Sequence, residues 1–323
     1  MSAPLLEVKG LTTWYPIRRG VWSRTVRHVQ ALTDVSLAIQ EGETLGIVGE
    51  SGCGKTTLGR TLVGLERPMA GAMLLRGAVL PAGIRPAALQ RQVQMIFQDP
   101  AAALNPRLTV LDLLTEALAY HGLLTESREA TALQLLRDVG LDGAALHRYP
   151  FEFSGGQRQR ISVARALALR PSLIICDEAV SALDVSVQAQ VLNLLMDLKE
   201  KYRLSYLFIS HDINVVRFIA DRVAVMYLGR IVEEGPTEDV IGSPAHPYTQ
   251  ALISAVPAVG REASARRPLG GELPSPSRPP EGCPFHPRCP SAMDICKTAA
   301  PPMISKGAQK VSCHLYSRDL SSE

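Results

Sequence analysis

The chain has 323 residues, of which 46% are hydrophobic, enough for one large or two modest globular domains with a real core. Its 34 basic and 31 acidic residues are interspersed and leave a net charge of +3, so no strong basic field points to nucleic acid. No apolar run approaches the ~20 residues that span a bilayer, and residues 1–10 lack the layout of a signal peptide. We expect a globular cytosolic protein whose six cysteines are reduced thiols or metal ligands.

Two strands are predicted near the N-terminus, at residues 5–11 and 32–39, where apolar residues recur at strand spacing. Trp14 and Tyr15 follow the first strand and precede a basic loop at residues 18–27. An aromatic ring just upstream of a phosphate-binding loop can stack on a purine base, and it can equally pack against a sheet edge. The residues alone leave both interpretations open.

A phosphate-binding loop is predicted between a strand at residues 44–48 and a helix at residues 58–65. The loop fits the pattern G-x-x-x-x-G-K-[ST], and its strand–helix context argues against a glycine-rich turn that matches by chance. Glycines let consecutive N–H groups point at a polyphosphate, while Lys55 reaches the β- and γ-phosphates and the Thr56 hydroxyl holds Mg²⁺. The loop residues are Gly49, Glu50, Ser51, Gly52, Cys53, Gly54, Lys55 and Thr56.

A helical insertion is predicted in the middle of an α/β core. Residues 71–80 have the pattern of a strand pair, and residues 94–97 form a buried strand that ends at Gln98. At a strand end that faces a nucleotide, Gln98 can touch Mg²⁺ or the attacking water, although most such glutamines are merely solvated. Residues 110–120 and 126–139 then show helical apolar spacing.

The segment Ser154, Gly155, Gly156 and Gln157 opens a further helix. Ser154 is a good N-cap, and the two glycines expose backbone N–H groups at the positive end of the helix. A second anion site is therefore one interpretation. A capped helix with no ligand is the other, and the pattern alone favours it.

Carboxylates follow the apolar run at residues 173–176, which is typical of a fully buried strand in a parallel sheet. Asp177 is placed to hold Mg²⁺ through water, and Glu178 to polarise a water for attack on the γ-phosphate. The next buried strand, residues 204–209, ends close to His211. A lone histidine is more often structural, but this is the fifth strand-end site on the same edge, which favours a functional role.

In this order, these motifs are similar to those of the nucleotide-binding subunit of ABC transporters, over residues 5 to about 240. Three stretches resemble the oligopeptide/dipeptide/nickel importer branch, and the chain resembles its F-type ATPase subunit more than the D-type. Those stretches are residues 98–106, 180–190 and 246–249.

The resemblance implies an α/β phosphate-loop NTPase core with an antiparallel β subdomain and an inserted helical subdomain at about residues 100–170. The ATP-binding domain would cover residues 1–242, and a small Cys-containing extension would cover residues 243–323.

Residue roles carried over from the resemblance concern ATP and Mg²⁺. By this resemblance, Glu178 would be the general base, His211 would hold the γ-phosphate and Gln98 would sense it, while Tyr15 rather than Trp14 would stack on adenine. Nucleotide contacts are implied for Tyr15, Gly49, Glu50, Ser51, Gly52, Cys53, Gly54, Lys55, Thr56 and Thr57. Magnesium contacts are implied for Thr56, Gln98 and Asp177. In trans, Ser154, Gly155, Gly156 and Gln157 close the ATP of a partner subunit, and Asp184 contacts that partner.

The implied function is an ATP-hydrolysing translocase subunit that energises import of di- or oligopeptides. Its implied partners are two transmembrane permease subunits, a D-type ATPase in a head-to-tail dimer and an extracytoplasmic binding protein, with no nucleic acid. The subunit would be peripheral, on the cytoplasmic face of the cell inner membrane, where the helical insertion and the segment after Gln98 meet the permeases.

Two other functions are less well supported. A soluble ABC ATPase acting on nucleic acid or ribosomes is disfavoured by the near-neutral charge and by the lack of a second cassette and a long coiled coil. A non-hydrolysing regulatory module is disfavoured because the hydrolytic residues Lys55, Asp177, Glu178 and His211 are all present.

Two positions depart from the family pattern. Phe153 replaces the commoner Leu before Ser154, a change that this branch tolerates. Ala179 follows Glu178 where the family usually has Pro, so we expect the backbone that aims Glu178 to be less rigid.

Four cysteines follow a Pro-, Gly- and Ser-rich linker expected at residues 261–280. Cys283, Cys289, Cys296 and Cys313 lie in some thirty residues of a cytosolic chain, which suggests a tetrathiolate site. The resemblance implies a [4Fe–4S] cluster, and Zn²⁺ and unligated thiols stay open as second and third alternatives. His286 and His314 could substitute as ligands, but we expect both to be surface residues.

Overall fold

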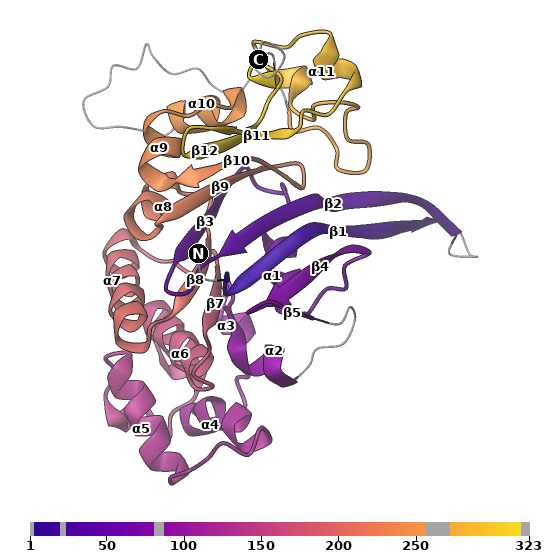
Figure 1. Ribbon diagram of the computed structural model, residues 1–323. Coiled ribbons are helices and arrows are strands. Elements are labelled where there is room, and N and C mark those ends of the chain that lie inside the picture. The colour runs from indigo at the N-terminus through magenta and orange to yellow at the C-terminus, as the bar shows by residue number, and fades with distance from the viewer. Residues whose placement is uncertain (1–2, 20–23, 81–86, 256–271, 318–323) are drawn as a thin grey trace.

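The computed structural model describes residues 3–19, 24–80, 87–255 and 272–317. Two sheets and several helices make up the molecule (Figure 1). The strands are β1 (Leu6–Arg19), β2 (Arg24–Ile39), β3 (Thr44–Val48), β4 (Ala70–Leu75), β5 (Ala78–Val79), β6 (Val93–Ile96), β7 (Leu173–Asp177), β8 (Ser205–Ile209), β9 (Arg222–Tyr227), β10 (Arg230–Pro236), β11 (Met303–Lys306) and β12 (Gln309–Ser312). The helices are α1 (Lys55–Leu62), α2 (Ala87–Gln92), α3 (Pro100–Ala103), α4 (Val110–Tyr120), α5 (Arg128–Asp138), α6 (Gly155–Leu167), α7 (Val185–Tyr202), α8 (Ile213–Ile219), α9 (Thr237–Gly242), α10 (Pro247–Ser254) and α11 (Ile295–Thr298).

The larger sheet has the strand order β11-β12-β10-β9-β3-β8-β7-β6. Strands β9, β3, β8, β7 and β6 run parallel to one another. Every residue of β3, β7 and β8 is buried, as expected for parallel strands covered on both faces. Their carboxyl ends therefore meet at one edge, which brings the loops after β3, β6, β7 and β8 together.

The smaller sheet is antiparallel, with the order β2-β1-β4-β5. The prediction of a basic loop at residues 18–27 is wrong for most of this range, because β1 continues to Arg19 and β2 begins at Arg24. Cross-strand pairing persists far beyond residue 11, with Tyr15 opposite Val29, so the two strands form one long hairpin. The β-branched and aromatic residues at 12–17 favour this extension.

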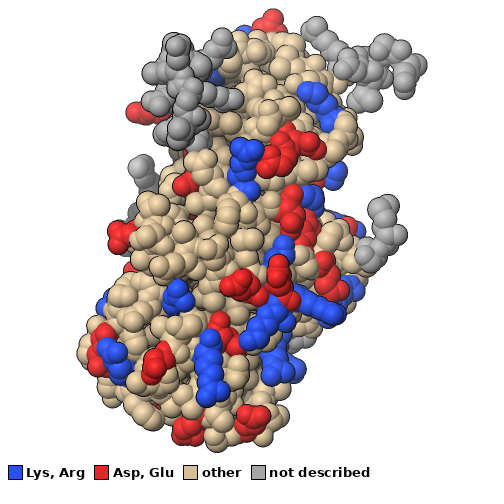
Figure 2. All heavy atoms as spheres, turned by 90° about the vertical axis from the view of Figure 1, so that its left-hand side faces the viewer, with Lys and Arg blue, Asp and Glu red and all other residues tan. Residues whose placement is uncertain are grey.

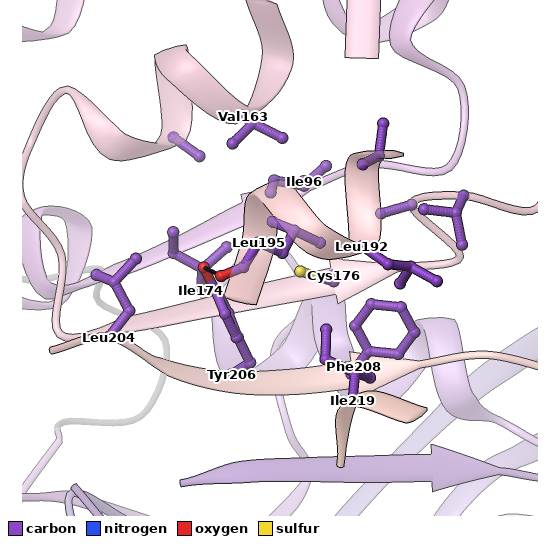
Figure 3. Close-up of a cluster of buried hydrophobic side chains, with 14 of the residues drawn as sticks. Ile96, Val163, Ile174, Cys176, Leu192, Leu195, Leu204, Tyr206, Phe208 and Ile219 are labelled. Carbon is purple, nitrogen blue, oxygen red and sulfur yellow. Dashed lines mark hydrogen bonds between the residues drawn. The ribbon is translucent and has the colours of Figure 1, made fainter. Parts of the chain in front are cut away.

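Two hydrophobic clusters cover the two faces of the larger sheet. One lies between this sheet, the smaller sheet and α1. The other lies against α4–α7, where Cys176 and Phe208 from the sheet point toward Leu192 and Leu195 of α7 (Figure 3). Tyr206 donates a hydrogen bond of 2.9 Å to the Leu195 carbonyl, which satisfies a polar group inside this core.

The first predicted helix of the insertion is confirmed, since α4 has the same bounds as the helical apolar spacing at residues 110–120. Thr109 and Asp112 form a capping box at its start, and Ser127 caps α5. The insertion lies at the bottom of Figure 1, and the C-terminal segment lies at the top. Strands β3, β8 and β7 lie between them.

Strands β11 and β12 extend the larger sheet from the C-terminal segment, because β12 pairs antiparallel with β10. Of the linker expected at residues 261–280, residues 261–271 lie outside the described residues. Residues 272–280 run back to the smaller sheet, where the Gln30 N–H donates to the Pro276 carbonyl at 2.9 Å.

Charges are mixed on the face that carries α7 and α8, where blue and red side chains lie among one another (Figure 2). Lys199 pairs with Asp221 and Arg217 with Glu238, each at under 3 Å. In the described ranges, no helix is both long enough and apolar enough to cross a membrane.

Candidate active site

The loop after β3 has a shape that only glycine permits at two positions. A Cβ atom at Gly49 would collide with the Met226 carbonyl oxygen, and one at Gly54 with the Ala31 carbonyl oxygen. Gly54 also has φ of 108°, a conformation that other residues rarely adopt. The tight curvature leads directly into α1, so the loop N–H groups and the positive helix end lie together.

Lys55 lies inside this loop, with 5% of its surface exposed. Its Nζ atom donates to the Gly49 carbonyl at 2.8 Å and to the Glu50 carbonyl at 3.0 Å. The ammonium group is therefore held within the loop, where it can interact with a bound phosphate chain.

Thr56 and Asp177 meet as the motifs predicted, although they are 121 positions apart. The Thr56 hydroxyl donates to Asp177 Oδ1 at 3.1 Å. Burial raises the pKa of Asp177, and the hydrogen bond from Thr56 opposes that rise. A hydroxyl and a carboxylate oxygen are suitable ligands for Mg²⁺, so this pair fits that ion.

Glu178, Gln98 and His211 converge from the ends of three adjacent strands. Gln98 Nε2 donates to Glu178 Oε2 at 3.1 Å, and His211 Nδ1 lies 3.2 Å from the same oxygen. The His211 side chain is 57% exposed and that of Glu178 is 18% exposed. The carboxylate is thus oriented by two polar groups while one side of the cluster remains open to solvent.

The Glu178 backbone has φ of 48°, in the left-handed region that a non-glycine residue rarely adopts. Three hydrogen bonds hold it: its N–H donates to the Ile209 carbonyl, and the N–H and Oγ of Ser181 donate to its own carbonyl. No sequence pattern indicated this strain, which is a common feature of functional sites. Ala179 lacks the ring with which a proline would restrict this backbone. The three hydrogen bonds hold the Glu178 backbone instead.

Tyr15 lines a cavity of about 350 Å³ in front of the phosphate loop. In the described part of the chain, Trp14 does not line this cavity, and its indole N–H donates to Thr33 Oγ1 at 3.1 Å. Adjacent strand residues point to opposite faces, which explains the difference. The lining residues are Tyr15, Val29, Ala31, Ser51, Gly52, Gly54, Lys55, Thr56, Thr57, Gln98, Glu178 and Pro276. Val29, Ala31 and Pro276 belong to no motif, so the sequence alone did not indicate that they line the cavity.

The segment 154–157 lies elsewhere and, among the described residues, does not line this cavity. Ser154 caps α6, as the pattern predicted, and it also forms a capping box with Gln157. Gly156 packs so closely on Val187 of α7 that a Cβ atom would collide with it. Ser154, Gly155 and Gln157 are exposed, as is Asp184 at the start of α7. These residues therefore form a surface that is separate from the cavity in front of the phosphate loop.

The four cysteines of the C-terminal segment are near one another but do not form a preformed ion site. The Cys283 N–H donates to the Cys296 carbonyl at 2.8 Å. Burial, together with the charges of the other three thiols, raises the pKa of Cys283 to about 11. Within the described part of the chain, no three His, Cys, Asp or Glu side chains are arranged to hold a metal ion.

The two neighbouring histidines differ from each other. His314 is buried, with 7% exposure, so its expected surface position is wrong. Its Nε2 lies 2.9 Å from the Ala299 carbonyl, which anchors the ring inside the segment. His286 is half-buried, with Nδ1 at 3.0 Å from the Cys283 carbonyl.

Two family descriptions match the chain. "ABC transporter" matches residues 32–181, and "Oligopeptide/dipeptide transporter, C-terminal region" matches residues 232–296. A probable peptide ABC transporter ATP-binding protein, y4tS of Sinorhizobium fredii, is 52% identical over 98% of this chain and 91% of its own length. The oligopeptide transport ATP-binding protein AppF of Bacillus subtilis is 49% identical, over 97% and 98%. The dipeptide transport ATP-binding protein DppF of Escherichia coli is 46% identical, over 99% and 96%.

A solved structure also matches the fold. The ATP-binding cassette MJ0796, in a dimeric post-hydrolysis state bound to ADP and Pi, has a TM-score of 0.62 and 28% identity. The match covers 72% of this chain and 98% of that one.

Proposed function

Because the chain belongs to the ABC transporter family, among ATP-binding subunits of peptide transporters, we propose that it hydrolyses ATP to drive peptide import. The observation that carries the proposal is the convergence of Gln98, Glu178 and His211 beside the phosphate loop. The relatives favour this function over a soluble ABC ATPase that acts on nucleic acid or ribosomes.

For hydrolysis, each side chain is proposed to act according to its place. Lys55 binds the β- and γ-phosphates, and Thr56 and Asp177 hold Mg²⁺, which neutralises charge on those phosphates. Glu178 polarises the attacking water, with Gln98 orienting the carboxylate and His211 contacting the γ-phosphate. Tyr15 stacks on the adenine ring from the wall of the cavity.

A second subunit is proposed to complete the site in trans. The segment 154–157 is exposed and outside this chain's own cavity, which supports its action on the ATP of a partner. The partner is a D-type ATPase in a head-to-tail dimer, contacted also by Asp184. The similar cassette MJ0796 is dimeric in its ADP- and Pi-bound state, which is consistent with this arrangement.

The other proposed partners are two permease subunits and an extracytoplasmic binding protein, at the cytoplasmic face of the inner membrane. The helical insertion at about residues 100–170 and the segment after Gln98 would dock on the permeases. Tyr120 and Phe151, at 81% and 66% exposed, are aromatic side chains on the surface of this insertion that such docking would cover. We propose residues 1–242 as the ATP-binding domain and residues 243–323 as its extension.

We further propose that Cys283, Cys289, Cys296 and Cys313 hold a [4Fe–4S] cluster. Their thiols are close enough to raise one another's pKa. Thiolates are the ligands of Fe–S clusters as well as of Zn²⁺, and the resemblance of this segment to the extension of peptide-importer ATPases favours the cluster. Anaerobic purification should give a brown protein with about four iron atoms per chain; a colourless protein with zinc or no metal would contradict the cluster.

Reconstitution tests the transport function. Proteoliposomes that contain this chain, its D-type partner and the two permeases should take up a labelled peptide only with ATP inside and binding protein outside. Glu178→Gln in this chain should abolish ATP-driven uptake while the complex still assembles. Copurification of nucleic acid with no permease would contradict the proposal.

A further inference from the structure

We propose that the C-terminal segment sets the charge and shape of the phosphate-binding loop, with Arg288 and Tyr248 as positioning residues that hold Glu50. This inference rests on the proposed binding of ATP by the loop. Glu50 is the second residue of the loop, yet its backbone N–H and its side chain contact residues more than 190 positions later in the chain. Among the described residues, Glu50 does not line the cavity that Gln98 and Glu178 line.

Arg288 forms a two-pronged ion pair with the Glu50 carboxylate. Nη1 lies 2.7 Å from Oε2, and Nη2 lies 2.9 Å from Oε1. The Arg288 side chain is 5% exposed and that of Glu50 is 25% exposed. Parallel charge-assisted hydrogen bonds fix both distance and orientation, so the carboxylate is strongly held.

Tyr248 holds the backbone of the same residue. Its hydroxyl accepts the Glu50 N–H at 2.9 Å, and its ring is fully buried against Tyr227 and Phe285. Phe285 lies three residues before Arg288, so the two anchors of Glu50 share one packed aromatic cluster.

The stretch 246–249, singled out in the sequence, positions Tyr248. His246 Nδ1 accepts the Tyr248 N–H at 3.0 Å and caps α10. The buried carboxylate of Glu233 in β10 accepts the N–H groups of Ala245 and His246, at 2.8 and 2.9 Å. The start of α10 is therefore tied to the larger sheet, and Tyr248 is placed with it.

Two consequences for ATP follow from this arrangement. An anionic residue in a loop that binds polyphosphate would repel its ligand unless its charge is neutralised, and Arg288 supplies that neutralisation. The Glu50 carbonyl also accepts the Lys55 ammonium at 3.0 Å, so a displaced Glu50 would disturb the residue that contacts the phosphates. Both effects predict weaker binding of ATP when Arg288 is neutral.

Binding of MgAMP-PNP, a slowly hydrolysed ATP analogue, by the full chain tests the proposal. We expect Arg288→Gln to raise the dissociation constant about tenfold or more, because the Glu50 charge is left unpaired. The double variant Glu50→Gln/Arg288→Gln should recover to within about threefold of wild type, since the repelling charge is gone. Tyr248→Phe keeps the ring and removes the acceptor, and should weaken binding about threefold.

A matched control separates this effect from the loss of any ion pair. Arg217 makes a similar two-pronged contact with Glu238, but on the exposed surface, so Arg217→Gln should bind the analogue as wild type does. Circular dichroism and thermal melting check that each variant is folded. If Arg288→Gln is not folded, the double variant and Tyr248→Phe are compared with wild type, and normal affinity in Tyr248→Phe would overturn the proposal.

The failure of this inference can be told apart from the failure of ATP binding itself. If the wild-type chain binds MgAMP-PNP and Lys55→Ala does not, the loop binds nucleotide. An Arg288→Gln affinity within twofold of wild type, or a double variant as weak as Arg288→Gln, would then overturn the positioning role alone. Wild type that does not bind the analogue would overturn both.

Discussion

Two groups of side chains near the phosphate-binding loop are built in opposite ways. In the first group, Gln98, Glu178 and His211 meet at strand ends, around a carboxylate that remains accessible from the cavity. In the second group, Glu50 is held by the buried side chains of Arg288 and Tyr248. The first group can exchange its internal contacts for contacts with a ligand. The second group is suited to keeping the loop in one position.

This difference predicts distinct consequences for substitutions in the two groups. Changes in the strand-end group should affect turnover more than folding or affinity. Changes in the group around Glu50 should affect folding and affinity first.

The largest effect is expected for Glu178→Gln. The amide keeps the shape of the side chain but cannot polarise water, so turnover should fall about 10²- to 10⁴-fold. Affinity for MgATP and the free energy of unfolding should stay close to wild type, since Gln still hydrogen-bonds its neighbours. Steady-state ATPase assays and calorimetry check this. An equal loss of affinity would mean that Glu178 acts mainly in binding.

A smaller effect is expected for Ser154→Ala, with Ser127→Ala as its matched control. Both serines cap a helix of the insertion, so both variants should lose about 1 kcal/mol of unfolding free energy. Only Ser154→Ala should lower ATPase turnover of the assembled ATPase pair, by about 10- to 100-fold, through a lost hydrogen bond to phosphate. Equal turnover in the two variants would refute a role for Ser154 in trans.

The strand-end group could be predicted from the sequence because each of its residues follows a buried apolar run of strand length. Parallel strands end at one sheet edge, so local patterns around Asp177, Glu178 and His211 were sufficient to place them together. The strand β3 and the helix α4 were likewise predicted with the bounds that the structure gives them. Local periodicity is a strong signal in such segments.

The group around Glu50 could not be predicted, because its contacts depend on tertiary packing. Arg288 and Glu50 are 238 positions apart, and neither lies in a pattern that specifies its partner. The pairing of β12 with β10 is also long-range, and it decides where residues 283–289 lie. The stretch 246–249 was a visible signal, but its sequence alone did not show that Tyr248 contacts the loop. For the same reason, the buried position of His314 was missed.

A stability measurement sharpens the contrast further. Arg288→Gln leaves the largely buried Glu50 carboxylate without its partner, so the free energy of unfolding should fall by about 2 kcal/mol. Arg217→Gln should give no measurable change, since the Arg217–Glu238 pair is on the surface. Urea unfolding of the two variants checks this. Equal midpoints would show that the Glu50 pair is no stronger than a surface pair.

The smallest effect concerns pH and His246, the residue that positions Tyr248 in the group around Glu50. Burial lowers the pKa of His246 from 6.5 to about 4, so the folded chain holds this residue neutral while the unfolded chain binds a proton below pH 6.5. Stability from this residue is therefore complete above pH 6.5 and is lost as pH falls toward 4, by about 1 kcal/mol between pH 7 and 5.5. Glu233, whose pKa is raised by burial, acts in the opposite direction. His246→Asn retains a good N-cap without a titrating ring, so its stability should fall less over the same range in urea unfolding. Parallel pH profiles for the variant and wild type would mean that His246 does not supply this pH dependence.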